Sequence, residues 1–170
     1  MPPPPTARLF FGSWSSHDLA HARALWCDPE VMRFLGGPLS EAMLAERLAT
    51  EIANEARLGI QYWPLFLREG GGRVGVCGLR PRDEASRLFT FGFHLHPAHW
   101  RRGFAFEAGR AVIDYAFAEA GASALFAGHH PENGASRAVL ARLGFAYTHD
   151  ALYPPTGLLH PSYLLKPVRV

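Results

Sequence analysis

Cysteine is scarce in this sequence: Cys27 and Cys77 are the only two in 170 residues, and they form no CxxC pair. Two separated thiols cannot supply the disulfide framework of a small secreted protein, so we expect both to be reduced and the protein to be cytoplasmic. Charge of one sign is also scarce. The formal net charge of +2 is too small to favour nucleic acid or an anionic membrane surface as a partner.

Long apolar runs are missing as well. No run approaches the roughly 18 residues of a membrane-spanning helix, and the proline-rich start lacks the charged and then apolar pattern of a secretory signal. The chain does contain 48% hydrophobic residues, which is enough for one substantial core. We therefore expect a disordered proline-rich tail over residues 1–6 and a single domain over 7–170.

Hydrophobic patterns alternate between strand and helix periods along the chain. The expected strands cover 8–14, 61–67, 73–79, 87–95, 124–129, 145–150 and 158–165, and expected helices include 17–27, 107–120 and 133–143. This order predicts an α/β (α+β) fold with a mixed, twisted central sheet of about seven strands and flanking helices.

The two helices near the N-terminus are expected to have side-chain caps and one apolar face each. Ser16 is the expected N-cap of the helix at 17–27, and Ser40 that of the next helix. In this second helix the expected apolar stripe is Met43, Ala45, Leu48, Ile52 and Ala56, and the expected solvated face is Glu41, Glu46, Arg47 and Glu51.

The stretch 94–106, HLHPAHWRRGFAF, connects an expected strand to an expected helix. A helix N-terminus has four N–H groups without intrahelical partners and the positive end of the macrodipole, so it favours an anion. Gly103 lets a ligand approach the backbone closely, and Arg101 and Arg102 add two permanent charges. The pattern therefore predicts a bound pyrophosphate at this turn.

Two blocks of sequence resemble the GNAT superfamily of acetyltransferases. The first, 95–105 (LHPAHWRRGFA), is similar to the family pattern of an apolar residue, a spacer, proline, two residues, glutamine or arginine, two residues, glycine, one residue, then glycine or alanine. Trp100 replaces the glutamine or arginine, which is typical of the branch with the ribosomal-protein N-terminal acetyltransferases. The second block, 133–145, resembles the NxxS…GF helix and turn of the family, and DPEVMRFLGG at 28–37 resembles the same branch.

The resemblance implies acetyl-CoA as co-substrate, no metal, and a GNAT fold in which two strands splay apart at a bulge near Gly92 to form an acyl-CoA cleft. In that cleft the backbone of Leu95 and His96 would bond the pantetheine amides. The N–H groups that would hold the pyrophosphate are those of Arg101, Arg102, Gly103, Phe104, Ala105 and Phe106. The last helix would add Asn133, which is also its expected N-cap, Ser136 and Arg137.

Two positions that carry acid and base in the family are changed here. Leu140 replaces a tyrosine that serves many members as general acid, and Thr90 replaces a glutamate that is frequent in this branch. The remaining proton donors are Ser136, Tyr147 and water, and the remaining bases are Glu84, His94, His96 and His129. From these sets, the expected catalytic residues are Ser136, His94 and His96.

The absence of a strong carboxylate base favours an acceptor amine of low pKa. An α-amine with a pKa near 8 is about a tenth neutral at pH 7, whereas a lysine amine near 10.4 is about 2.5 units worse, or roughly 3.4 kcal/mol. The expected reaction is therefore direct acetyl transfer to a primary amine, the α-amine of a protein N-terminus or of a small amino compound. The oligomeric state is open and includes a homodimer.

Two other functions stay open at this point. A catalytically silent acyl-CoA-binding module would keep both sequence blocks and lack a usable acid and base. A metal-dependent hydrolase would need His94, His96 and His99, with His129 and His130, to converge on zinc. A third pattern is rejected, because Gly70, Gly72 and Gly75 match the dinucleotide-binding GxGxxG by letter but lie between two expected strands.

Overall fold

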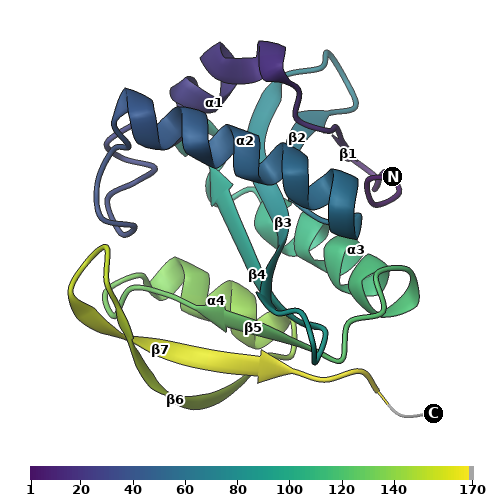
Figure 1. Cartoon of the computed structure of the whole chain (residues 1–170), viewed down its shortest axis with the longest axis vertical. Helices are drawn as coiled ribbons and strands as arrows, with labels where there is room; N and C mark the ends of the chain where they lie inside the picture. The colour runs from purple at the N-terminus through teal and green to yellow at the C-terminus, as the bar shows by residue number, and fades with distance from the viewer. Residues whose placement is uncertain (169–170) are drawn as a thin grey trace.

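The computed structural model describes residues 1–168, in which a seven-stranded sheet is flanked by helices (Figure 1). The strands are β1 (Leu9–Phe11), β2 (Tyr62–Leu67), β3 (Arg73–Asp83), β4 (Leu88–Leu95), β5 (Ala124–Gly128), β6 (Ala146–Tyr153) and β7 (Leu158–Leu165). Their order is β1-β2-β3-β4-β5-β7-β6, and of the neighbouring pairs only β4 and β5 run parallel. The expected mixed sheet of about seven strands is confirmed.

Helices cover both faces of this sheet. They are α1 (Leu19–Trp26), α2 (Glu41–Leu58), α3 (Phe104–Ala118) and α4 (Gly134–Arg142), with 3-10 turns at Ser16–Asp18 and Pro97–His99. Trp63 and Cys77 lie in one core cluster with α3 and α4, whereas the adjacent Tyr62 and Val76 lie in another with α1 and α2. Because side chains alternate across a strand, these clusters occupy opposite faces, with α2 in front of the strands in Figure 1 and α3 behind.

The first helix begins differently from the prediction. The N-cap is Ser15 rather than Ser16: Ser15 Oγ accepts from His17 N, and Asp18 Oδ2 accepts from Ser15 N in a capping box. This reciprocal pair stabilises a 3-10 turn before α1, so the α-helix itself starts at Leu19. No helix in the part of the chain that the structure describes is long and apolar enough to cross a membrane.

The helix α2 begins at Ser40 as predicted, since Ser40 Oγ accepts from Met43 N at 3.2 Å. The predicted apolar stripe is right for Leu48, which is buried, and for Ile52, which packs against the core, but it is wrong for Met43, Ala45 and Ala56, which are exposed. Glu51, expected on the solvated face, is buried together with Leu44. Glu51 can be buried because Arg80, on the neighbouring strand β3, donates to its carboxylate. The sequence placed Glu51 on the solvated face, because its partner Arg80 comes from a distant part of the chain and no local pattern reveals the pair.

The strands β4 and β5 splay apart, as the resemblance implied (Figure 1). They pair only from Leu88↔Ala124 to Thr90↔Phe126, although β4 continues to Leu95. His96 N donates to Val74 O at 3.0 Å. Backbone N–H and C=O groups alternate between the two sides of a strand, so the even-numbered residues of β4 direct theirs towards the antiparallel strand β3. The N–H groups of Phe93 and Leu95 therefore face the gap towards β5.

The bulge expected near Gly92 is wrong. The pairing of β4 with β3 is continuous from Gly75↔Leu95 to Pro81↔Phe89, so the gap opens where the β5 pairing ends. Gly92 has another structural role. A Cβ atom at this position would lie 2.2 Å from the hydroxyl of Tyr62, so only glycine allows the Tyr62 ring to lie against β4.

The N-terminal segment contacts the folded part of the chain at two positions. Pro3 is buried. The hydroxyl of Thr6 donates to Glu107 Oε1 at 2.6 Å, and Thr6 O accepts from Arg68 Nη1 at 3.0 Å. These bonds place Thr6 with the residues of the domain, although the sequence assigned it to the tail.

Candidate active site

The N-terminus of α3 has the geometry of an anion site. Gly103 is the N-cap with φ of 79°, in the left-handed region, and no side chain caps the helix. The first intrahelical bond is from Glu107 N to Gly103 O at 3.0 Å, so the N–H groups of residues 103–106 have no partner within the helix. The structure thus brings together the predicted backbone donors of Gly103, Phe104, Ala105 and Phe106.

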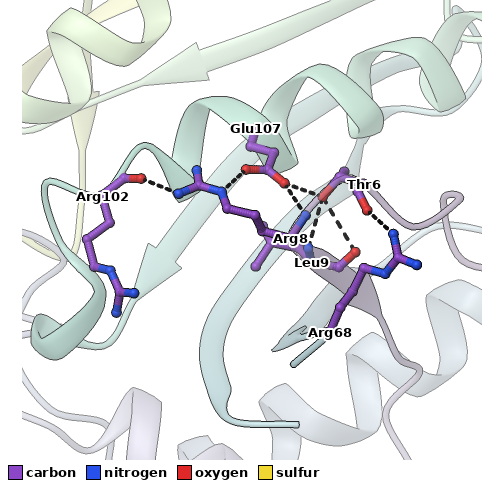
Figure 2. A network of polar contacts seen from close by, with 6 residues as sticks. All are labelled: Thr6, Arg8, Leu9, Arg68, Arg102 and Glu107. Carbon is purple, nitrogen blue, oxygen red and sulfur yellow. Dashed lines mark hydrogen bonds and ion pairs between the residues drawn. The ribbon is translucent and has the colours of Figure 1, made fainter. Parts of the chain in front are cut away.

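An ion-pair network connects this helix end to the N-terminal strand (Figure 2). Arg8 Nε donates to Glu107 Oε2 at 2.7 Å, and Arg8 Nη1 donates to Arg102 O at 3.0 Å. Burial opposes ionisation of Glu107, but hydrogen bonds from Thr6 and Arg8 more than offset it and lower its pKa. Sequence reasoning missed Arg8, which is 94 residues away from Arg102 and shares no motif with it.

Positive side chains surround the helix end. An open surface pocket of about 580 Å³ lies beside it, and its lining includes Gly103, the cations Arg8, Arg110 and Arg142, and the carboxylates of Glu107 and Asp114. Arg142 comes from α4 and stacks on the ring of Phe106, with 4.2 Å from Cζ to the ring centroid. The two arginines expected from the sequence, Arg101 and Arg102, are thus joined by Arg8, which precedes β1 and pairs with Glu107, by Arg110, which pairs with Asp114, and by Arg142 of α4.

The turn between β4 and α3 corrects one predicted contact. His96 N donates to Val74 O and His96 O accepts from His99 N at 2.9 Å, so the His96 N–H is not free to donate to pantetheine and its carbonyl oxygen already has one partner. Leu95 O accepts from Trp100 Nε1 at 2.8 Å, while its N–H faces the gap. The unusual Trp100 therefore has a structural role, since its indole holds the turn at the end of β4.

His94 lies on the α1 and α2 side of β4 and is not suited to act as a base. Its Nδ1 accepts from Trp26 Nε1 at 3.1 Å, and its ring meets the ring of Tyr62 edge-on. Burial, together with the positive charge of Arg47, lowers the pKa of His94 to about 3. A catalytic rate that rises through pH 6.5, as for an unperturbed histidine base, is therefore not expected from His94. For His96, burial and the neighbouring His99 lower the pKa.

Because His94 is neutral in the folded state, we expect the protein to lose stability in acid. An unfolded histidine takes up a proton near pH 6.5, whereas folded His94 does so only near pH 3, so protonation favours the unfolded chain as the pH falls through this range. Urea unfolding between pH 7 and 4 should show this loss, and His94→Gln should reduce it, with the remainder coming from His21, whose pKa burial lowers to about 4. His17→Gln, at an exposed position, is the control; equal slopes for both variants would contradict the assignment.

The N-terminus of α4 contains the second group of predicted cofactor contacts. Asn133 Oδ1 accepts from Ser136 N at 3.1 Å, which confirms Asn133 as the N-cap and leaves its Nδ2 free to donate. Ser136 is half-buried and Arg137 is exposed on the same helix end. Leu140 lies in the core at 2% exposure, which is consistent with an apolar residue in place of a tyrosine.

Of the proton donors left open by the sequence, Tyr147 is exposed and bonds to Asp150 Oδ1 at 3.2 Å. The structure adds a pair that sequence reasoning missed. His129 Nδ1 lies 2.7 Å from His130 O, so it must carry the proton, and His129 Nε2 then accepts from the hydroxyl of Tyr163 at 3.0 Å. The pair forms because Tyr163 of β7 lies opposite Ala127 of β5.

The histidines do not converge as the hydrolase alternative requires. His94 bonds to Trp26, His99 stacks edge-on against Phe104, and His129 bonds to Tyr163. Within residues 1–168, no group of three or more histidine, cysteine, aspartate or glutamate side chains is arranged to hold a metal ion.

Comparisons with known proteins agree with this geometry. The acetyltransferase (GNAT) domain family matches residues 8–146. The Bacillus subtilis (strain 168) protein YkkB is 30% identical over 125 residues, 73% of each chain. The FsC-acetyl coenzyme A-N(2)-transacetylase of Aspergillus fumigatus is 30% identical over 168 residues, 90% of this chain and 70% of its own.

A solved structure shows the same fold over nearly the whole chain. The crystal structure of an acetyltransferase from Agrobacterium tumefaciens has a TM-score of 0.83 and 25% sequence identity, with coverage of 98% of this chain and 95% of its own. The open strand pair and the free helix N-terminus are thus found in a chain that is similar to acetyltransferases in both sequence and fold. We conclude that this chain belongs to the GNAT family of acetyltransferases and is an acyltransferase.

Proposed function

We propose that this protein transfers an acetyl group from acetyl-CoA directly to the α-amine of a protein N-terminus or of a small amino compound. The observation that carries the proposal is the continuity between the β4–β5 gap and the N-terminus of α3, which are joined by the turn at 96–103. Unpaired strand backbone and free helix N–H groups along one path suit a long ligand with amides at one end and a pyrophosphate at the other.

The residues that line this path would hold acetyl-CoA, which supplies an acetyl group activated as a thioester. In the proposal, the N–H groups of residues 103–106 bind the pyrophosphate, Leu95 N–H bonds the pantetheine, and Phe93 N–H polarises the thioester carbonyl. The α4 side would contribute Asn133 Nδ2, Ser136 and Arg137. As the new N–C bond forms, the C–S bond breaks, the amine loses one proton and the thiolate gains one, for which Ser136 remains the candidate donor.

The choice of an α-amine follows from the bases that the site offers. Thr90 stands at the position where relatives carry a glutamate, and His94 is neutral with its Nδ1 already bonded to Trp26. Of the other candidate bases, Glu84 pairs with Arg57, burial lowers the pKa of His96, and His129 Nε2 accepts from Tyr163. We therefore expect the acceptor to supply a neutral amine largely by its own pKa. An α-amine does this about 300-fold better at pH 7 than a lysine side chain, from the difference of about 2.5 pKa units.

A pair of peptides tests this choice. Both carry one internal lysine, and one has a free N-terminus while the other is blocked. We expect acetyl-CoA-dependent thiol release to be about 300-fold faster with the free peptide at pH 7, and mass spectrometry to find the acetyl group on its α-amine. Equal rates with the two peptides would contradict the proposal, and silence with both would restrict it to small amino compounds.

A further inference from the structure

A half-buried arginine on α2, Arg47, has a buried hydrogen-bonding group without a partner among the described residues. The guanidinium of Arg47 stacks over the ring of Trp26, with 4.7 Å from Cζ to the centroid, and lies 5.6 Å from the centroid of Tyr62. Its Nε donates to Glu51 Oε1 at 3.2 Å. Its Nη2 is buried and has no hydrogen-bond partner among the described residues. An unsatisfied charged donor inside a protein is costly, so such a group indicates a missing partner.

The charges around Arg47 do not cancel. Glu51 is fully buried and accepts from Tyr62 N at 2.7 Å, from Arg47 and from both Nε and Nη2 of Arg80. Burial raises the pKa of Glu51 to about 7. Whether Glu51 is ionised or protonated, two guanidinium groups meet at most one carboxylate. This buried cluster therefore has a net positive charge.

Several contacts place Arg47 beside the reacting end of the proposed acetyl-CoA path. The ring of Trp26, on which Arg47 stacks, donates to His94, and His94 follows Phe93, whose N–H faces the gap. Arg47 thus lies on the side of β4 from which an amine can reach the gap without crossing α3.

We infer that Arg47 binds a carboxylate of the acceptor, so that the substrate is an α-amine that carries a carboxylate within a few bonds of it. This inference rests on the proposed function. The guanidinium is flat, its Nε is bonded to Glu51 and its two Nη groups have no hydrogen-bond partner among the described residues, so this edge suits a planar carboxylate that can receive a forked pair of hydrogen bonds. The same positive charge disfavours polyamines. The carboxylate can belong to an acidic second residue of a peptide or to the terminus of a small dipeptide.

Matched acceptors that differ only in charge distinguish these sources. One pair consists of peptide amides with serine first and aspartate or asparagine second, and the other of alanylalanine and its amide. We expect kcat/KM to be about tenfold to hundredfold higher for the acidic member of at least one pair, as for a hydrogen bond to a charged group. If acceptors are turned over but neither pair shows a higher kcat/KM for its acidic member, the inference is overturned and the proposed function stands.

Variants on one helix then assign the preference to Arg47. We expect Arg47→Met to abolish it and Arg57→Met, which removes an exposed arginine that pairs with Glu84, to keep it. Should Arg47→Met fail to fold, Arg47→Lys, which keeps the charge but loses the fork, should reduce the preference. A preference that both Arg47 variants retain in full would overturn the assignment.

Calorimetry separates the subsite from catalysis if no acceptor is turned over. The subsite would be supported, while the proposed function falls, by two results together. The wild type should bind alanylalanine more tightly than its amide, and the Arg47 variants should bind alanylalanine about tenfold or more weakly than the wild type does. Equal binding of the dipeptide and its amide would overturn the inference.

Discussion

Gly103→Val is expected to abolish acetyl-CoA binding, whereas Arg101→Ala and Arg102→Ala should each weaken it by about tenfold at most. Gly103 has φ of 79°, and its N–H belongs to the free group at the start of α3. A valine there would be strained, and its Cβ would lie 3.4 Å from Arg8 Nη2 beside the free N–H groups that are proposed to hold the phosphate. The lost charge of one arginine is partly replaced by the remaining N–H groups and the helix dipole. Calorimetry with acetyl-CoA measures all three variants.

The control for Gly103→Val is a second glycine with the same backbone conformation. Gly70 has φ of 78°, and a Cβ atom there would meet nothing within 4 Å. Gly70→Val therefore introduces similar backbone strain in the β2–β3 hairpin and should leave acetyl-CoA binding intact. Tight binding by Gly103→Val, or loss of binding in Gly70→Val while it remains folded, would refute the assigned anion site.

Glu51→Ala is expected to destabilise the fold by about 3–5 kcal/mol, the cost of removing one partner from a buried ion pair. Without this carboxylate, Arg47 and Arg80 lose their shared counter-ion and Tyr62 N loses its acceptor. Glu51→Gln keeps an oxygen that can accept from Tyr62 N, so it should lower the free energy of unfolding by less than Glu51→Ala does. Urea unfolding at pH 8 gives the free energies of unfolding.

Glu46→Ala on the same helix is the matched control for the Glu51 variants. Glu46 is exposed, so its loss should change the free energy of unfolding by only about 0.5 kcal/mol. If Glu51→Ala were as mild as Glu46→Ala, the carboxylate would not hold the two arginines in place, and the positive cluster described for Arg47 would need another explanation.

Local sequence was sufficient to predict the anion-binding turn and the start of α4. Gly103 follows an apolar strand and precedes a helix, and Asn133 has the side chain that caps the next helix, so neighbouring residues determine both features. The splayed strands were expected only from the family resemblance. The bulge at Gly92 was wrong because the glycine accommodates Tyr62, which lies on another strand.

The acceptor side could not be predicted because its contacts connect distant parts of the chain. Arg80 and Glu51 are 29 residues apart, and Trp26 and His94 are 68 apart. The helical pattern placed Arg47 and Glu51 on a solvated face, as is usual for charged residues. Only the position of α2 against β3 shows that Arg80 allows Glu51 to be buried. The low pKa of His94 likewise depends on burial that no local pattern reveals.

A crystal structure with a nonhydrolysable acetyl-CoA analogue tests the central claim most directly. We expect the pyrophosphate within hydrogen-bonding distance of the N–H groups of residues 103–106 and the pantetheine in the gap between β4 and β5. The acyl carbonyl should accept from Phe93 N–H, and the adenine should lie on the α4 side of the helix end. A pyrophosphate bound elsewhere, or a gap closed by direct pairing of β4 with β5, would contradict the account.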